Sequence, residues 1–314
     1  MKTTMTRGRA LALAASGAAV ATGFPAIVRA QTSTIRIAAS SAATQAEGYF
    51  ADQLGYFKQA GISATITTTG RGAETLEAVV RGDIDIASAT PEGIANAIIH
   101  NIPLKIIAIG TIFVEPAPVI LAVAKDSTIK SASDLANTTL GVNSLNDSQT
   151  LGVWQWMTNS KVDPTSVKIV EIPFASISAA LQRKEIASGC LVEPFASAAK
   201  ADTRAVPGVY NTLGRHWALG VWYAHADFIA KNPALVKQVV SALYATAKHV
   251  NANPSSVEQL LVTYTKLPIE TIRTIVQPVL AEKAERSCIE PQLQSAAKFK
   301  VISRPVSYEE VMLA

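Results

Sequence analysis

Residues 81–93 read R-G-D-I-D-I-A-S-A-T-P-E-G and predict a helix end, a turn, a buried strand and a binding loop in succession. An apolar repeat at helical spacing leads up to Arg81, and Gly82 follows as the residue most easily placed in the left-handed conformation that ends a helix. Apolar residues then predict a short strand over 84–87. Thr90 is the expected N-cap of the next helix, with Pro91 at its first position.

The end of this strand is the first place where we expect a ligand. In an open α/β sheet, ligands bind at the carboxyl ends of strands and beside helix N-termini, because unpaired N–H groups point outward there. Ser88 and Thr90 are therefore the first candidate ligand-binding residues. The alternative for Thr90 is that it only caps its helix.

The preceding residues repeat the same alternation of strand and helix. We expect strands over 34–39 and 62–69, a helix over 46–57 that is closed by Gly61, and a second helix over 73–81. A strand-helix-strand-helix-strand series implies a parallel sheet with right-handed crossovers.

The first thirty residues predict a secretory signal peptide. Basic residues open the chain, an apolar run follows over 10–24, and small residues lead to a cleavage site near Ala30, whose exact position stays open. Arg7 and Arg9 are separated by Gly8, which favours the Sec route over a twin-arginine route. The chain has 28 basic and 24 acidic residues, and four of the basic ones lie in this segment. The mature chain is thus close to neutral, which argues against a nucleic-acid partner.

Few residues in the chain suit catalysis or metal binding. Cys190 and Cys288 are the two cysteines, and whether they form a disulfide is left open. The four histidines are scattered, so we expect neither a zinc site nor another metal site, and no cofactor. The chain lacks G-x-S-x-G, H-E-x-x-H and P-loop motifs, so we expect no catalytic residues.

Several motifs together resemble one family of transport proteins. They are L-G-Y-F-x-x-x-G-I at 54–62, G-D-I-D-I-A at 82–87, S-D-L at 133–135, V-E-P-F at 192–195 and D-F-I-x-x-N-P at 227–233. The chain is similar in these motifs to the periplasmic solute-binding proteins of ABC importers for taurine, alkanesulfonates and nitrate, a group related to thiamine-pyrimidine-precursor synthases. The resemblance extends over almost the whole mature chain.

The resemblance implies an α/β fold, the two-lobed periplasmic binding protein fold of type II. Each lobe would be a mostly parallel sheet flanked by helices, and two strands would form the hinge. We expect residues 31–123 and 222–314 to form lobe 1 and residues 124–221 to form lobe 2, after the signal peptide of residues 1–30. Beyond Asn232, which we expect to cap a helix, further helices over 257–264, 269–279 and 308–312 should pack on lobe 1.

The same resemblance implies a function in transport. We expect a periplasmic monomer that captures a small anionic organic solute, a sulfonate or a carboxylate, by hinge closure and delivers it to the membrane subunits of an ABC permease. Two alternatives use the same fold: an enzyme of the pyrimidine-precursor type, whose expected cysteine-rich motif is absent here, and an orphan ligand sensor. The identity of the solute stays open.

The candidate ligand-binding residues come from the expected strand ends in both lobes. They are Ser40, Ser41, Arg71, Gly72, Ser88, Thr90, Asn143, Ser144, Asn146, Glu193 and Trp222. Most offer hydroxyl, amide or backbone N–H donors, which suit an anionic group. Arg71 could hold a carboxylate or sulfonate through two bonds, or be a solvent-facing turn residue. Glu193 could bind an amine or stabilise its own turn, and Trp222 could stack on an aromatic solute.

Overall fold

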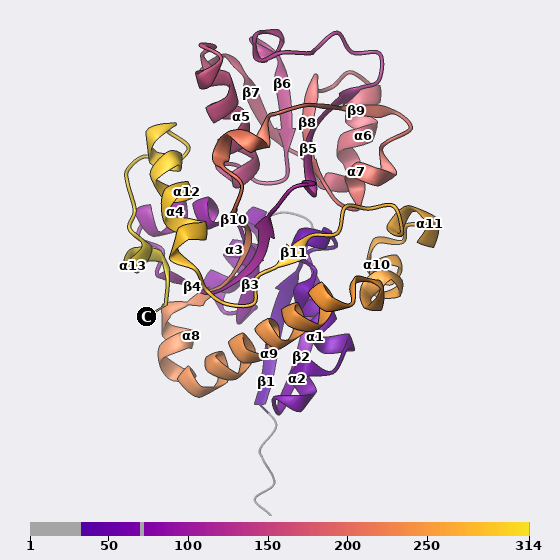
Figure 1. The fold of residues 1–314 in the computed structure, drawn as a ribbon. Coiled ribbons are helices and arrows are strands. Elements are labelled where there is room, and N and C mark those ends of the chain that lie inside the picture. Colours follow the sequence, from indigo (N-terminus) through magenta and orange to yellow (C-terminus); the bar gives the residue numbers. More distant parts are fainter. Residues whose placement is uncertain (1–32, 70–71, 314) are drawn as a thin grey trace, which may run out of the picture. The chain divides into compact units, whose positions relative to one another are not determined.

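The computed structural model describes residues 33–69 and 72–313 (Figure 1). The expected signal peptide, its cleavage site and Arg71 therefore lie outside the described residues. The described residues all belong to one compact unit.

The first sheet has six strands in the order β11-β4-β10-β3-β1-β2. β1 pairs in parallel with β2 and β3, whereas β10 is antiparallel to both β3 and β4. The expected parallel sheet thus holds for the first three strands of the chain, and the later strands make the sheet mixed. The bounds are β1 Ser33–Ala39, β2 Ile62–Thr68, β3 Ile86–Ala89, β4 Leu104–Phe113, β10 Trp217–His225 and β11 Val279–Leu280.

The second sheet has five strands in the order β7-β6-β8-β5-β9. β6 is parallel to β7 and β8, and β5 is antiparallel to β8 and β9, so this sheet is also mixed. The bounds are β5 Val119–Ala124, β6 Thr139–Val142, β7 Lys168–Glu171, β8 Ser188–Val192 and β9 Thr203–Val206.

The chain passes between the two sheets twice, from β4 to β5 through residues 114–118 and from β9 to β10 through residues 207–216. β5 belongs to the second sheet and the whole of β10 to the first. The lobe boundaries stay a proposal, and strand pairing favours placing them at these two connections rather than at residues 123 and 221.

Thirteen α-helices lie among the described residues. They are α1 Glu47–Gln53, α2 Tyr56–Gln59, α3 Gly72–Arg81, α4 Pro91–Ile99, α5 Ser148–Asn159, α6 Phe174–Gln182, α7 Phe195–Ala198, α8 Ala226–Lys231, α9 Pro233–Ala252, α10 Glu258–Thr265, α11 Ile269–Ile272, α12 Arg286–Lys298 and α13 Tyr308–Val311.

Three expectations about helices need correction, and one helix was not expected. The helix expected over 46–57 is two helices, because Gly55 takes a left-handed φ of 82° between α1 and α2. The helix expected over 269–279 ends at Ile272 and leads into β11. Asn232 precedes α9, but its side chain donates to the Phe228 carbonyl of α8 at 3.0 Å instead of capping α9. The local sequence pattern did not predict α12.

Helices cover both faces of the first sheet. On one face, α1, α2, α9 and α10 enclose a core that includes Phe50, Phe57 and Trp222. Figure 1 shows α9 running beside α1 and α2, although more than 170 residues separate them along the chain. On the other face, α3, α4, α12 and α13 enclose a second core around Ile94 and Ile289. The second sheet has a core of its own with α5 and α6.

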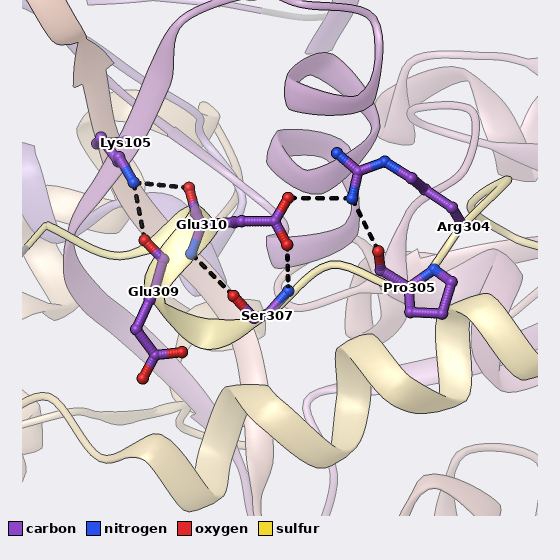
Figure 2. Close-up of polar contacts among 6 residues, drawn as sticks. All are labelled: Lys105, Arg304, Pro305, Ser307, Glu309 and Glu310. Atoms are coloured by element: carbon purple, nitrogen blue, oxygen red, sulfur yellow. Dashed lines mark hydrogen bonds and ion pairs between the residues drawn. The ribbon is translucent and has the colours of Figure 1, made fainter.

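Hydrogen bonds from β4 hold α13, the C-terminal helix, against the first sheet (Figure 2). Lys105 Nζ donates to the carbonyls of Glu309 at 2.9 Å and Glu310 at 2.7 Å. A capping box between Ser307 and Glu310 begins α13, and Arg304 pairs with the same Glu310 carboxylate at 3.0 Å. Donors at the end of a helix satisfy carbonyls that have no partner within it, so these contacts hold the last residues on the sheet.

Candidate functional site

The ends of five strands meet at one pocket. Its volume is about 330 Å³, and its lining includes residues that directly follow β1, β2, β3 and β6, together with the last residue of β7. Because these strands belong to both sheets, the pocket lies between the loops of the first sheet and those of the second. This is where the strand order predicts a ligand site.

Seven of the expected ligand-binding residues line this pocket: Ser40, Gly72, Ser88, Thr90, Asn143, Ser144 and Asn146. Thr90 also caps α4, because its Oγ1 accepts a hydrogen bond of 3.3 Å from the Gly93 amide. The two interpretations of Thr90 are therefore compatible.

Three expected residues lie elsewhere. Ser41 is not among the lining residues, although its neighbour Ser40 is. The Glu193 carboxylate is buried at its own turn, where it accepts from the Ser197 hydroxyl at 3.0 Å and from the Val276 amide at 3.2 Å. The structure thus favours the interpretation of Glu193 as a stabiliser of its turn.

Trp222 is the third of these residues and is 2% exposed. Its Nε1 donates to Glu47 Oε2 at 2.6 Å, on the face of the sheet that α1 covers. Successive residues of a strand face opposite sides. The next residue, Tyr223, is therefore the one that lines the pocket.

Four helices begin at the pocket. Gly72 opens α3, Thr90 precedes α4, Asp147 precedes α5 and Phe174 opens α6, and all four residues belong to the lining. The first-turn N–H groups of a helix have no partner within the helix, and they give its N-terminus a partial positive charge. The described lining contains no Lys, Arg or His. The helix ends therefore offer partial positive charge to the pocket, and Glu77, Asp147 and Glu171 add carboxyl groups to the same lining.

Two buried carboxyl groups lie at the pocket: Asp147 is a lining residue, and Glu92 precedes the lining residue Gly93. Asp147 caps α5 by accepting from the Thr150 amide at 2.8 Å, and burial raises its pKa to about 7. Glu92, on α4, accepts from the Ser148 hydroxyl of α5 at 2.7 Å, and burial raises its pKa to about 7 as well. The Glu92 bond joins a helix of the first sheet to a helix of the second.

Sequence reasoning missed several lining side chains. They are Gln45, Thr69, Asn96, Gln149, Glu171, Phe174 and Tyr223, among others. Thr69 directly follows β2 and Glu171 ends β7, so the rule that selected Ser88 could also have selected these two. Gln45 and Asn96 lie in helical segments, and nothing in the local pattern marks them.

The two cysteines lie apart from the pocket and from each other. Both are free and buried; Cys190 belongs to the core of the second sheet and Cys288 to a core of the first. The Tyr210 hydroxyl donates to Cys190 Sγ at 3.0 Å, and burial raises the pKa of this thiol. Neither cysteine lines the pocket.

A family model described as NMT1/THI5 like matches residues 43–257. The chain belongs to this family. The match covers every lining residue of the pocket except Ser40, and therefore the pocket loops of both sheets. No curated protein sequence matches this NMT1/THI5-like chain significantly.

Solved structures show the fold of this NMT1/THI5-like protein. The alkanesulfonate-binding protein SsuA from Xanthomonas axonopodis pv. citri, bound to MOPS, aligns with a TM-score of 0.75 and 16% identity over 90% of this chain and 99% of its own. The periplasmic nitrate-binding protein NrtA from Synechocystis PCC 6803 aligns with a TM-score of 0.74 and 13% identity over 89% and 84%. The protein therefore has the two-lobed periplasmic binding protein fold.

The same fold also occurs in an enzyme. The desulfurization enzyme DSZB aligns with a TM-score of 0.59 and 14% identity over 88% of this chain and 95% of its own. The fold alone therefore does not show whether a protein binds a solute or converts it. That distinction depends on the residues of the pocket. Within the described part of the chain, no helix has both the length and the apolar character needed to cross a bilayer.

Proposed function

We propose that this protein is the periplasmic solute-binding component of an ABC importer and that it captures a small organic solute carrying a sulfonate or carboxylate group. The observation that carries this proposal is the convergence of four helix N-termini on one pocket lined by hydroxyl and amide side chains. An anionic group gains favourable charge interactions at helix N-termini and accepts hydrogen bonds from such donors. Arg71 would add two further donors next to Gly72.

The contacts of the pocket favour binding over catalysis. An enzyme of this fold would need an activated nucleophile or a matched acid and base at the solute. Among the described lining residues there is no Cys, His or Lys, and of the three carboxyl groups in the lining, those of Glu77, Asp147 and Glu171, that of Asp147 caps α5. An orphan sensor would use the same pocket and the same closure. Solute binding is therefore common to the importer component and the sensor.

Binding would act through closure of the two lobes. A solute that contacts loops of both sheets favours the closed form by the difference between its affinities for the two forms. A solute with micromolar affinity supplies about 8 kcal/mol in total, which is enough for such a shift. The closed form would then be the one that a membrane permease recognises.

The test is a thermal-shift screen of the purified protein against sulfonates, carboxylates, nitrate, aromatic acids and pyrimidines, followed by an assay for consumption of each hit. A solute at 100 times its Kd adds about 2.7 kcal/mol to the free energy of unfolding. We expect a raised melting temperature with a sulfonate or carboxylate and no consumption. Consumption of the hit would establish an enzyme instead, and a shift only with cationic solutes would refute the anionic class.

A pair of variants assigns the binding to this pocket. Ser144→Trp places a large side chain in the lining and should abolish the shift. Ser160→Trp adds the same side chain at the exposed end of α5 and should leave the shift unchanged. Equal shifts in both variants would show that the solute binds elsewhere.

A further inference from the structure

Three potential metal ligands meet outside the pocket, at the start of β10. Cys288 Sγ lies 3.3 Å from His216 Nδ1 and 3.9 Å from His216 Nε2. A carboxylate oxygen of Glu285 joins them, and the three ligand atoms lie within 4.8 Å of one another. The imidazole is exposed, the carboxylate is half-buried and the thiol is buried, so an ion could reach them from solvent on one side.

Two of these residues border regular elements, and the third lies within one. His216 directly precedes β10, Glu285 directly precedes α12, and Cys288 is the third residue of that helix. Glu285 is the N-cap of α12 and has an extended backbone, and its carbonyl accepts from the Cys288 amide at 3.0 Å. This hydrogen bond of the first turn keeps Glu285 and Cys288 close together.

The next turn of α12 fixes the register against the strand. Gln292 accepts from the Ala218 amide at 3.1 Å and donates to the Ala218 carbonyl at 2.9 Å. Residues 288 and 292 lie on one face of the helix, and His216 directly precedes β10. The double hydrogen bond thus holds the start of β10, and with it His216, close to Cys288.

The donor set fits one class of ion. In zinc sites the Zn–S distance is about 2.3 Å and the Zn–N distance about 2.0–2.1 Å, so at a tetrahedral angle sulfur and nitrogen are about 3.5 Å apart. The observed separation of 3.3 Å is close to this value. A thiolate ligand favours zinc and related transition metals over magnesium or calcium.

We propose that His216, Glu285 and Cys288 bind a zinc-like divalent transition-metal ion, with water as the fourth ligand. On binding, the Cys288 thiol releases its proton to solvent and the thiolate coordinates the ion. Lys283 pairs with Glu285 Oε1 at 3.1 Å, but its ammonium is exposed, and exposed pairs of this kind are weak. Glu285 can therefore turn its carboxylate to the ion at small cost.

The proposal revises the expectation that the chain has no metal site. That expectation rested on the scatter of cysteines and histidines along the sequence. The fold brings together residues that are 72 positions apart. The ion would link residues 207–216, which return from the second sheet, to α12, which packs on the first. None of its three ligands lines the solute pocket.

The experiment uses the protein expressed from its full sequence, purified without a polyhistidine tag and stripped with a chelator. Zn²⁺ is titrated by calorimetry, and Co²⁺ is added in parallel because a cobalt–thiolate bond gives a charge-transfer absorption. The variants are Cys288→Ser, His216→Ala and Glu285→Gln. The matched controls are Cys190→Ser, which removes the other buried thiol, and His100→Ala, which removes another exposed imidazole.

We expect one Zn²⁺ per chain and a cobalt–thiolate band, with affinity falling at least about tenfold in each ligand variant and unchanged in both controls. Melting temperatures measured without metal verify that each variant is folded. Absence of stoichiometric Zn²⁺ binding would overturn the proposal. So would a cobalt spectrum without the thiolate band, or equal Zn²⁺ affinity in Cys288→Ser, His216→Ala and the controls.

Discussion

The indole of Trp222 and the carboxyl of Glu47 form a buried pair, with a hydrogen bond of 2.6 Å from Nε1 to Oε2. The pair joins the first turn of α1 to the centre of β10, and Glu47 Oε1 is buried without a hydrogen-bond partner among the described residues. Burial raises the pKa of Glu47 well above its usual value. Burial thus disfavours the ionised form of this carboxyl, which accepts the indole N–H.

Glu47→Ala should destabilise the protein by roughly 2–4 kcal/mol, because it leaves the indole N–H unpaired and opens a cavity. Glu47→Gln keeps an acceptor of the same shape without the ionisable group, so its stability at pH 7.5 should lie within about 1 kcal/mol of the parent. Urea unfolding of the three proteins measures both effects. An equal loss in both variants would show that the buried pair depends on an ionised carboxylate.

The raised pKa of Glu92 predicts a fall in stability as pH rises. A carboxyl whose folded pKa is about 7 instead of 4.5 retains a proton that the unfolded chain has released. The folded state binds more protons between these two values, so the free energy of unfolding decreases there, by up to about 3 kcal/mol for this group. The contribution of Glu92 to the free energy of unfolding is fully present below pH 4.5 and is lost as pH rises through 7.

Glu92→Gln should remove this part of the pH dependence. The amide oxygen can still accept from the Ser148 hydroxyl, so the variant should be more stable than the parent at pH 8 and similar at pH 4.5. Denaturation curves at several pH values test this. Glu270→Gln, at an exposed position, is the control and should follow the parent curve; parallel curves for parent and Glu92→Gln would contradict the assignment.

Local sequence patterns correctly predicted a helix cap and a strand end at the pocket, because both depend on a few neighbouring residues. Thr90 was expected as an N-cap from its own neighbours, and its side chain accepts a hydrogen bond from an amide of the first helical turn. Ser88 was expected at a strand end because small residues precede Pro91, and it lines the pocket. Caps and strand ends are determined within a few residues, so they can be read without the fold.

The features that were missed depend on contacts between distant segments. Trp222 and Tyr223 are adjacent, and which of them faces the pocket depends on which face of β10 α1 covers. α12 contains Pro291 and was not predicted, so the neighbours of Cys288 were unknown. His216 and Cys288 meet only because β10 and α12 pack together, and no local pattern contains that information.

Lys105→Met should loosen the C-terminal segment while keeping the aliphatic part of the side chain. The change removes two hydrogen bonds to the carbonyls of Glu309 and Glu310, with an expected loss of about 1 kcal/mol because the site is exposed. Hydrogen exchange should be faster at the Leu313 amide, which bonds to the Ile106 carbonyl at 2.8 Å. Lys237→Met, on the exposed side of α9, should leave this exchange rate unchanged.

Gly72 and Ser144 control how closely the loops of the two sheets approach. A Cβ added at Gly72 would lie 2.7 Å from Ser144 Oγ and 3.0 Å from Ser144 Cβ, closer than side-chain atoms approach each other. Since Cβ of Ser144 is fixed to its backbone, Gly72→Ala should force the loops apart. Overpacking of this kind typically costs 1–3 kcal/mol. If closure over the solute needs this contact, solute affinity should fall roughly tenfold.

The double variant Gly72→Ala, Ser144→Gly decides whether the effect arises from this contact. Removing the Ser144 side chain makes room for the added methyl group, so the double variant should bind the solute more tightly than Gly72→Ala alone. Calorimetric titration of the parent, both single variants and the double variant gives the coupling energy between the two positions. A coupling energy of zero would mean that Gly72→Ala acts through α3 alone, and that the loops do not need to meet when the solute is bound.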